Sequence, residues 1–275
     1  MRTPIAERQA CRLISQLVCD RYGIQMRDGK EALIQARLGK RIRNLGLAGV
    51  AAYCDLLRKR DDPEEWTLVV DALTTNCTQF LREADHFSWM VEQAVPSAPK
   101  QNGKPFRVWS AACSSGEEAC SIGMCLAEHG PAVPGWDWEV TASDISTKVL
   151  GRAKLGIYAE DSLKELPRPW LQKYFQKGLG QWEGYYRVKR IIADRIHFQQ
   201  INLMADYSHP HPFQIIFLRN VMIYFDHASR EQIVNRLCRF LVPQGYLLTG
   251  HSESLNGLNV PLRYLRPSIY QSTLP

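Results

Sequence analysis

The pattern of apolar positions changes near residue 75. Before that point apolar residues recur three or four positions apart, as Ile34 and Leu38 do, which predicts three or four short amphipathic helices. After it, short apolar runs alternate with helical segments, a pattern typical of an α/β fold built on a parallel sheet. We therefore expect a helical domain over residues 1–75 and a larger α/β domain over 76–275.

The elements of the α/β domain can be placed from their apolar runs and turn residues. Strands are expected at 106–111, 138–143, 196–203, 213–218 and 245–250. Helices are expected at 117–129, 147–155 and about 228–241. The last stretch, 264–272, suits a final antiparallel pair of strands.

The alternation of strands and helices is interrupted over 156–195. In this stretch Gly178, Gly180 and Gly184 precede an aromatic and basic run, which predicts an exposed β-hairpin. We expect it to form a small inserted β subdomain over about 172–195. The strand edges of such an insertion can hydrogen-bond an extended peptide, and a surface hairpin without a partner is the alternative interpretation.

The basic residues are concentrated at one end of the chain. Residues 1–60 hold 13 Lys and Arg against 5 Asp and Glu, a net charge of +8, whereas the remainder holds 21 against 23. This asymmetry indicates a partner surface with negative charge. Four basic residues lie on or near one flank of the second predicted helix: Lys30, Arg37, Lys40 and Arg41. A solvated helix face is the alternative interpretation of that flank.

The composition argues against several classes of protein. With 45% hydrophobic and 23% charged residues, the 275-residue chain is typical of soluble globular proteins. No apolar run approaches 18 residues and the first residues lack the apolar segment of a secretion signal, so we expect neither a membrane span nor export. The eight cysteines form no CxxC pair and no zinc spacing, which predicts free thiols in a reducing cytosol. His209 and His211 lack a third ligand nearby, so no metal site is expected.

The strongest chemical signal is the strand at 106–111, the turn of small residues that follows, and the helix that opens on Glu117 and Glu118. A strand, a tight turn and a helix N-terminus form the nucleotide-binding end of a Rossmann-type unit. Small side chains from Ala111 to Gly116 let a ligand approach the backbone, and Gly116 can adopt a positive φ. Two carboxylates there disfavour a diphosphate, because a helix N-terminus attracts an anion only where none is already present. The turn indicates a nucleoside pocket, with an ordinary α/β turn as the alternative.

Further polar residues are placed to complete such a pocket. Asp144 ends the second strand, where a carboxylate can accept hydrogen bonds from ribose hydroxyls. The alternative interpretation is a helix cap, since Asp144 or Ser146 could cap the helix at 147–155. Asn76, Thr78 and Arg82 offer an amide, a hydroxyl and a cation within one short polar segment. A plain linker, the alternative, would hardly require all three.

Five segments of the chain resemble the CheR family, the chemoreceptor glutamate methyltransferases of bacteria. They are Leu73–Arg82, Trp109–Glu118, Ala142–Ser146, Arg219–Asp226 and Gly250–Ser254. Each is weak alone, but together they occur in order, at compatible spacing, over nearly the whole chain. The departures are small: Leu81 stands where the family often has an aromatic residue, and Leu218 where a smaller one is common.

The resemblance implies a class I S-adenosylmethionine-dependent methyltransferase, with a Rossmann-like α/β fold, an N-terminal helical domain and an inserted antiparallel β subdomain. It implies transfer of a methyl group from S-adenosylmethionine to glutamate side chains of methyl-accepting chemotaxis proteins. The products would be glutamate methyl esters, used in sensory adaptation, and S-adenosylhomocysteine. The alternatives are a non-catalytic S-adenosylmethionine-binding signalling module and a nucleic-acid methyltransferase that uses the basic N-terminal domain.

The resemblance also assigns roles by position. Residues implied at the cofactor are Asn76, Thr78, Arg82, Glu118, Asp144, Asn202, Leu203, Arg219 and Asn220. Arg82 and Tyr224 are implied as catalytic residues near the reacting carboxylate. Receptor contacts are implied for Lys30, Arg37, Lys40, Arg41, Gly178, Gly180 and Gly184.

The implied partner is the cytoplasmic domain of chemoreceptors. The basic N-terminal helix would face the acidic methylation region, and the glycine-containing hairpin would bind a peptide at the receptor C-terminus. We expect a cytoplasmic monomer that reaches the membrane only through its receptors and binds no nucleic acid.

Overall fold

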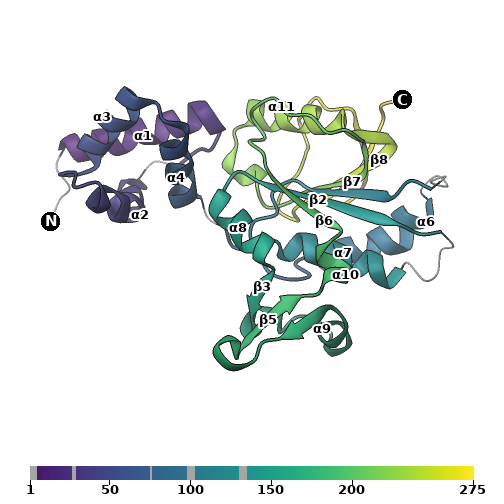
Figure 1. Ribbon diagram of the computed structural model, residues 1–275. Helices are drawn as coiled ribbons and strands as arrows, with labels where there is room; N and C mark the ends of the chain where they lie inside the picture. Colours follow the sequence, from purple (N-terminus) through teal and green to yellow (C-terminus); the bar gives the residue numbers. More distant parts are fainter. Residues whose placement is uncertain (1–4, 27–28, 75, 98–102, 130–134) are drawn as a thin grey trace.

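The computed structural model describes residues 5–26, 29–74, 76–97, 103–129 and 135–275. A helical part at the N-terminal end is followed by a larger α/β part (Figure 1). The predicted domain boundary falls on residue 75, which lies outside the described residues.

The helical part consists of α1 (Ile5–Tyr22), α2 (Glu31–Asn44), α3 (Val50–Arg60) and α4 (Pro63–Leu73). These helices pack around a core of their own, which includes the fully buried Leu38, Tyr53 and Trp66. α4 begins at Pro63 because proline suits the first helical position, and the Asp62 carboxylate caps it by accepting from the backbone N–H of Glu64. The predicted helices of this part are confirmed.

A seven-stranded sheet organises the α/β part, in the order β6-β2-β1-β7-β8-β10-β9. Its strands are β1 (Phe106–Ser110), β2 (Trp138–Asp144), β6 (Ile196–Gln200), β7 (Phe213–Leu218), β8 (Leu241–Thr249), β9 (Leu262–Arg266) and β10 (Ile269–Ser272). The first five strands in this order are parallel, and β10 is antiparallel to β8 and β9. Because parallel strands end at the same edge, the tips of β1, β2 and β7 lie together at the point where the strand order reverses.

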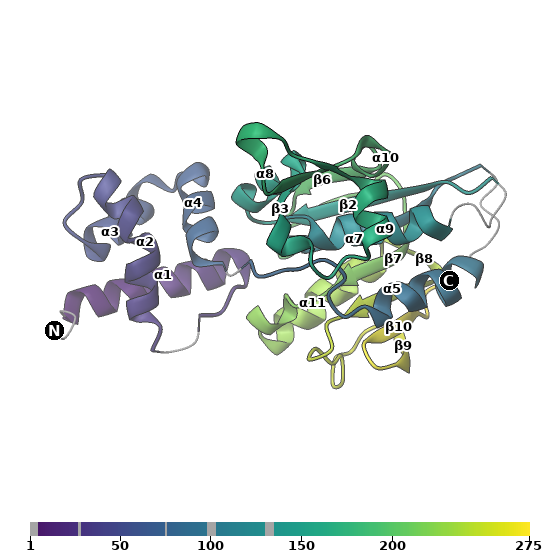
Figure 2. The same cartoon turned by 90° about the horizontal axis from the view of Figure 1, so that it is seen from below.

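Helices cover both faces of this sheet (Figures 1 and 2). α7 (Glu117–His129), α8 (Thr147–Leu155) and α10 (Arg190–Ala193) lie on one face, and α11 (His227–Cys238) lies on the other. Side chains of neighbouring strand residues enter opposite cores. Phe106 and Phe217 pack on the α7 side, and Trp109 and Ile216 pack with α11. The sheet is therefore buried on both faces, as the apolar strands predicted.

The α/β part begins with a helical segment that the sequence pattern did not predict. It runs through α5 (Asp85–Trp89), the π-helix η1 (Met90–Ala94) and α6 (Val95–Ser97). His86, Phe87 and Met90 are buried beneath it, next to the core of the sheet. The pattern missed this segment because its apolar face is short and the residues that precede it are mostly polar.

The predicted hairpin is present as β4 (Phe175–Lys177), η4 (Gly180–Trp182) and β5 (Tyr185–Val188). It forms an antiparallel sheet in the order β3-β5-β4, in which β3 (Ile157–Ala159) precedes the predicted span of 172–195. The turn η3 (Glu160–Leu163) and helix α9 (Arg168–Tyr174) connect β3 with β4. Tyr158, Phe175 and Val188 belong to the core of the α/β part, so the small sheet is packed against it.

Among the described residues, no helix combines the length and the apolar character that crossing a membrane requires.

All eight cysteines are free thiols, as predicted. Six of them are buried, and burial raises the pKa of thiols such as Cys120 and Cys125 to about 12. These thiols stay protonated near neutral pH, and a protonated thiol is a poor nucleophile. Their role is therefore to pack in the core.

Candidate functional site

A pocket lies at the carboxyl ends of β1, β2 and β7, where the helical part meets the α/β part. Tyr22, Ile24 and Leu33 form its wall on the helical side. All the predicted cofactor and catalytic residues line it: Asn76, Thr78, Arg82, Glu118, Asp144, Asn202, Leu203, Arg219, Asn220 and Tyr224. The fold thus brings together segments that are widely separated in the sequence.

The turn after β1 borders the pocket through Ala111, Ala112 and Ser114. Gly116 has the predicted positive φ, +94°, a conformation that residues with a Cβ resist. A Cβ at Gly116 would lie 2.9 Å from Ala153 Cβ and 2.9 Å from the Tyr158 hydroxyl oxygen. Close packing against α8 and β3 is a second reason for glycine at this position.

Asp144 is fixed at the tip of β2 by two backbone donors. Its Oδ2 accepts from the N–H of Ser114 at 2.9 Å, and its Oδ1 accepts from the N–H of Ser146 at 2.9 Å. Of the two candidate caps, Ser146 caps α8, because its hydroxyl oxygen accepts from the N–H of Val149, and Asp144 does not. Burial raises the pKa of Asp144 in spite of these donors. The carboxylate is left bordering the pocket.

Arg219, at the end of β7, lies between two carboxylates and is 1% exposed in its side chain. Nη1 donates to Glu118 Oε2 at 3.0 Å, and Nη2 donates to Glu83 Oε2 at 3.0 Å. Nη2 also donates to the carbonyl of Arg82. The Ser110 hydroxyl donates to the other oxygen of Glu118 at 2.6 Å. These contacts connect β1, α7, β7 and the segment after α4 at one edge of the pocket.

The pKa values of the two carboxyl groups around Arg219, those of Glu118 and Glu83, are shifted in opposite directions. Burial raises the pKa of Glu118, and the charge of Arg219 only partly opposes that effect. Burial acts in the same sense on Glu83, but the charge and hydrogen bonds of Arg219 outweigh it and lower the pKa of Glu83. Glu83 was not among the predicted site residues. Its place directly after Arg82 was the one signal of it in the sequence.

Asn220 has a left-handed backbone conformation, with φ at +57°. Its N–H donates to Glu253 Oε2 at 2.7 Å, and the same oxygen accepts from the N–H of Gly250 at 2.9 Å. A Cβ at Gly250 would lie 2.6 Å from Asn220 Nδ2. Glu253 is 5% exposed and supports the tip of β7, yet we did not predict it, although it lies in the segment Gly250–Ser254.

Arg82 and Tyr224 face the same space. Tyr224 lies in the short turn η5 (Met222–Tyr224) and is half-buried. Burial raises the pKa of its phenol, while the nearby charges of Arg37 and Arg82 lower it, and the net shift is upward. The hydroxyl is therefore protonated near neutral pH and can donate a hydrogen bond. The carbonyl of Tyr224 accepts from the N–H of Gln25 at 2.7 Å, which ties this turn to the segment after α1.

The remaining predicted residues that line the pocket are Asn76, Thr78, Asn202 and Leu203. The carbonyl of Asn76 accepts from the Ser114 hydroxyl at 3.3 Å, which attaches the segment after α4 to the turn after β1. Asn202 Nδ2 donates to the carbonyl of Arg21 at 3.2 Å, and its Oδ1 accepts from the N–H of Met204 at 3.0 Å. The amide of Asn202 thus attaches the end of α1 to the α/β part.

The four basic residues assigned to receptor contact differ in their surroundings. Lys30 and Arg37 line the pocket, and Arg37 donates to backbone carbonyls at the end of α4. Arg41 Nε donates to the buried Glu65 at 2.9 Å. Lys40 is exposed. A uniform solvated face is therefore wrong for this flank, because Arg37 and Arg41 hold helices together.

The three predicted glycines lie in the β4–β5 hairpin and are not part of the pocket lining. Gly180 and Gly184 have φ values of +59° and +79°, and a Cβ at Gly178 would lie 2.1 Å from the Trp182 carbonyl oxygen. The hairpin itself requires these glycines. It presents Leu179 and Trp182, which are 82% and 48% exposed.

Two family models match the chain, one for each part. The CheR methyltransferase all-alpha domain matches residues 9–74, and the CheR methyltransferase SAM binding domain matches residues 76–269.

Curated relatives agree with these matches. The chemotaxis protein methyltransferase of Escherichia coli (strain K12) is 43% identical over 248 residues, which cover 90% of this chain and 85% of that protein. Its counterpart in Salmonella typhimurium is 43% identical over 248 residues, with coverages of 90% and 84%. That of Borreliella burgdorferi is 33% identical over 275 residues, with coverages of 97% and 95%. Since both domains match in order and the relatives align over most of their length, this chain belongs to the CheR family of methyltransferases, with S-adenosylmethionine as its cofactor.

Proposed function

We propose that this protein methylates glutamate side chains of chemoreceptors and so forms the methyl esters used in sensory adaptation. Methyl transfer in chemotaxis follows from the family, and the glutamate acceptor and the receptor are what we add. One observation carries the proposal: Arg82, Tyr224 and Arg37 bring two cations and a protonated phenol to the pocket that Asp144 borders.

The side chains present suit S-adenosylmethionine. An acid at the tip of β2, Asp144, can take ribose hydroxyls, because each carboxylate oxygen has a lone pair beyond the one used by the backbone. Ile145 and Leu203 offer apolar surface for adenine. Asn76 and Thr78 supply an amide and a hydroxyl for the amino-acid end. No phosphate is present in this cofactor, which agrees with the acids at the start of α7.

The acceptor needs orientation more than activation. A glutamate carboxylate is already ionised near pH 7, so the pocket requires no general base. S-adenosylmethionine, when bound, supplies an electrophilic methyl group next to a positive sulfur. A new C–O bond then forms as the C–S bond breaks, which leaves the methyl ester and S-adenosylhomocysteine. Holding both partners in line makes the step effectively unimolecular.

Arg82 and Tyr224 are the residues we propose for orienting the acceptor. The guanidinium of Arg82 and the hydroxyl of Tyr224 can both donate to one carboxylate oxygen and leave the other free to attack. The charge on sulfur disappears during the reaction, so fixed donors in a site shielded from water favour the transition state. The side chains of Tyr22, Ile24 and Leu33 provide such shielding on the helical side.

Two surfaces outside the catalytic region are proposed to meet the receptor. The basic flank of α2 leads into the pocket through Lys30 and Arg37, and it suits an acidic helix. The β4–β5 hairpin, with its exposed Leu179 and Trp182, suits a peptide at the receptor C-terminus. We propose that the enzyme works as a monomer in the cytoplasm and reaches the membrane only through receptors. Calorimetry with receptor tail peptides tests the hairpin, and absence of any heat of binding counts against it.

The decisive experiment is methyl transfer from labelled S-adenosylmethionine to receptor-containing membranes. We expect label on the receptor that base releases as methanol, which identifies an ester. Label in a base-stable linkage would contradict the glutamate assignment. Membranes that lack receptors serve as the control.

The two alternatives gain no support from the comparisons. A nucleic-acid methyltransferase would incorporate label into RNA or DNA, and a non-catalytic module would bind S-adenosylmethionine without turnover. The relatives aligned over nearly the whole chain are named as chemotaxis protein methyltransferases, and the comparisons favour neither alternative.

A further inference from the structure

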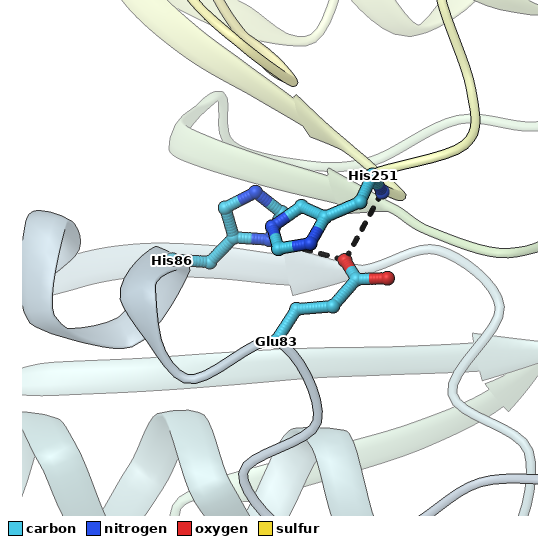
Figure 3. A group of neighbouring side chains, drawn as sticks. All are labelled: Glu83, His86 and His251. Carbon is cyan, nitrogen blue, oxygen red and sulfur yellow. Dashed lines mark hydrogen bonds and ion pairs between the residues drawn. The ribbon is translucent and has the colours of Figure 1, made fainter.

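Glu83, His86 and His251 point toward one another beside the pocket (Figure 3). His86 Nδ1 lies 3.6 Å from Glu83 Oε2, and the two imidazole rings are 4.9 Å apart between centroids. His86 is fully buried, and neither of its ring nitrogens has a hydrogen-bond partner. Two histidines and a carboxylate are a common metal-binding set, so this group calls for an explanation.

A cation already contacts the carboxylate of this group. Glu83 Oε2 accepts from Arg219 Nη2 at 3.0 Å and Nε at 3.3 Å, and also from the N–H of His251 at 3.3 Å. The second oxygen, Oε1, accepts from Asn220 Nδ2 at 3.4 Å. A metal ion on Oε2 would lie beside the guanidinium, with strong repulsion between like charges in a buried site. Glu83 is therefore arranged around Arg219 and not around a metal.

The backbone around Glu83 has an unfavourable conformation that these contacts hold in place. Leu81 and Glu83 have φ values of +52° and +56°, so Arg82 lies between two left-handed residues that are not glycine. Such conformations cost free energy and persist only where the surroundings enforce them. The N–H of Leu81 donates to the Ser121 hydroxyl at 3.0 Å, and the carbonyl of Arg82 accepts from Arg219. After Arg82, the hydrogen bonds of the Glu83 side chain to Arg219 and Asn220 hold the backbone in this conformation.

We propose that Glu83 is a positioning residue for the cofactor pocket. Its carboxylate fixes Arg219 and Asn220 at the tip of β7, and through Arg219 it fixes the turn that carries Arg82. These three residues line the pocket, whereas Glu83 does not. The inference rests on the proposed function for the role of Arg82, but cofactor affinity tests it without any acceptor substrate.

Calorimetric titration with S-adenosylhomocysteine is the test, on the full-length chain with substitutions at Glu83. We expect Glu83→Gln to raise the Kd about tenfold, the scale of one charge-assisted hydrogen bond. Glu83→Gly relieves the left-handed backbone but removes the carboxylate, and it should raise the Kd at least as much. Asp85→Asn is the matched control, because Asp85 pairs with the His251 ring at 3.2 Å and does not contact Arg219. Its Kd should stay within about twofold of the parent value.

The titration separates positioning from folding. Partial unfolding lowers the number of sites per chain, whereas lost positioning raises the Kd of the molecules that are folded. Parent-like affinity in Glu83→Gly or in Glu83→Gln would overturn the proposal. A repeat with tenfold molar excess of ZnCl2 should leave the parent Kd unchanged. A loss of affinity with zinc in the parent but not in Glu83→Gln would make Glu83 a metal ligand and would also overturn it.

Discussion

The backbone N–H of Ser114 donates to Asp144 Oδ2 at 2.9 Å and so joins the turn after β1 to the tip of β2. These residues are 30 positions apart in the sequence, and the parallel register of β1 and β2 makes them neighbours. The small-residue turn after β1 and Asp144 therefore form one hydrogen-bonded unit at the carboxyl ends of these two strands. The same register leaves the Asp144 carboxylate facing the pocket.

Asp144→Asn should weaken cofactor binding. The amide has the size of the carboxylate, but it lacks the charge, and its NH2 group would face a backbone N–H of Ser114 or Ser146. We expect the Kd for S-adenosylhomocysteine to rise by about 10- to 100-fold, as for loss of a hydrogen bond to a charged group. Asp137→Asn, in the partly exposed pair with Arg195, is the control. Equal effects of both substitutions would contradict a binding role for Asp144.

Arg82→Ala should lower turnover by roughly 100-fold, the scale of losing one positioned contact to developing charge. Single-turnover rates at saturating S-adenosylmethionine measure the chemical step alone. Arg58→Ala, on the exposed end of α3, should leave that rate unchanged. If Arg82→Ala transfers methyl groups as fast as the parent, Arg82 has no part in the mechanism.

The buried imidazole of His86 should make stability depend on pH. Burial, together with the charges of Arg219 and His251, lowers the pKa of His86 from 6.5 to about 4, although Asp85 and Glu83 act in the opposite sense. Between these values the unfolded chain binds a proton that the folded chain does not. Stability should therefore fall as pH drops from about 6.5 toward 4, by at most about 1.4 kcal/mol per pH unit from this residue.

Urea unfolding at pH 7.0 and pH 5.0 measures this dependence. In His86→Gln the difference between the two pH values should shrink, because the substituted side chain has no proton to gain. An identical pH dependence in parent and variant would show that His86 does not contribute.

Lys40→Glu should raise the KM for receptor without altering the kcat. Lys40 is exposed and lies outside the pocket lining, unlike Lys30, whereas reversing Arg37 or Arg41 would also break contacts within the helical part. We expect an increase of about fivefold at low ionic strength that diminishes with added salt, since surface charge acts mainly on encounter. Lys59→Glu on α3 makes the same charge change away from that flank. Equal effects of the two substitutions would indicate net charge alone, without local docking.

Many polar residues of the pocket could be predicted, because they lie at recognisable positions, whereas the wall formed by Tyr22, Ile24 and Leu33 was not. Asp144 and Arg219 directly follow apolar strands, and parallel strands end at one edge, so local patterns imply their proximity. Glu83 and Glu253 were missed for the opposite reason. Glu83 meets Arg219 across 136 positions, and Glu253 meets Asn220 across 33. Nothing local in the sequence indicates such contacts.

The sequence by itself determined the helices and strands with clear apolar spacing, the turn after β1 and the family, because apolar spacing, turn residues and motifs act over short stretches of chain. It did not reveal the helical segment from α5 to α6 or the strand β3. The tertiary structure alone decided which donors surround each polar group. It showed that Ser146 caps α8 while Asp144 borders the pocket, that Gly116 is needed for packing, and that Arg41 pairs with Glu65. Hydrogen bonds and ion pairs of this kind depend on distances of about 3 Å, and only the folded chain brings remote segments that close.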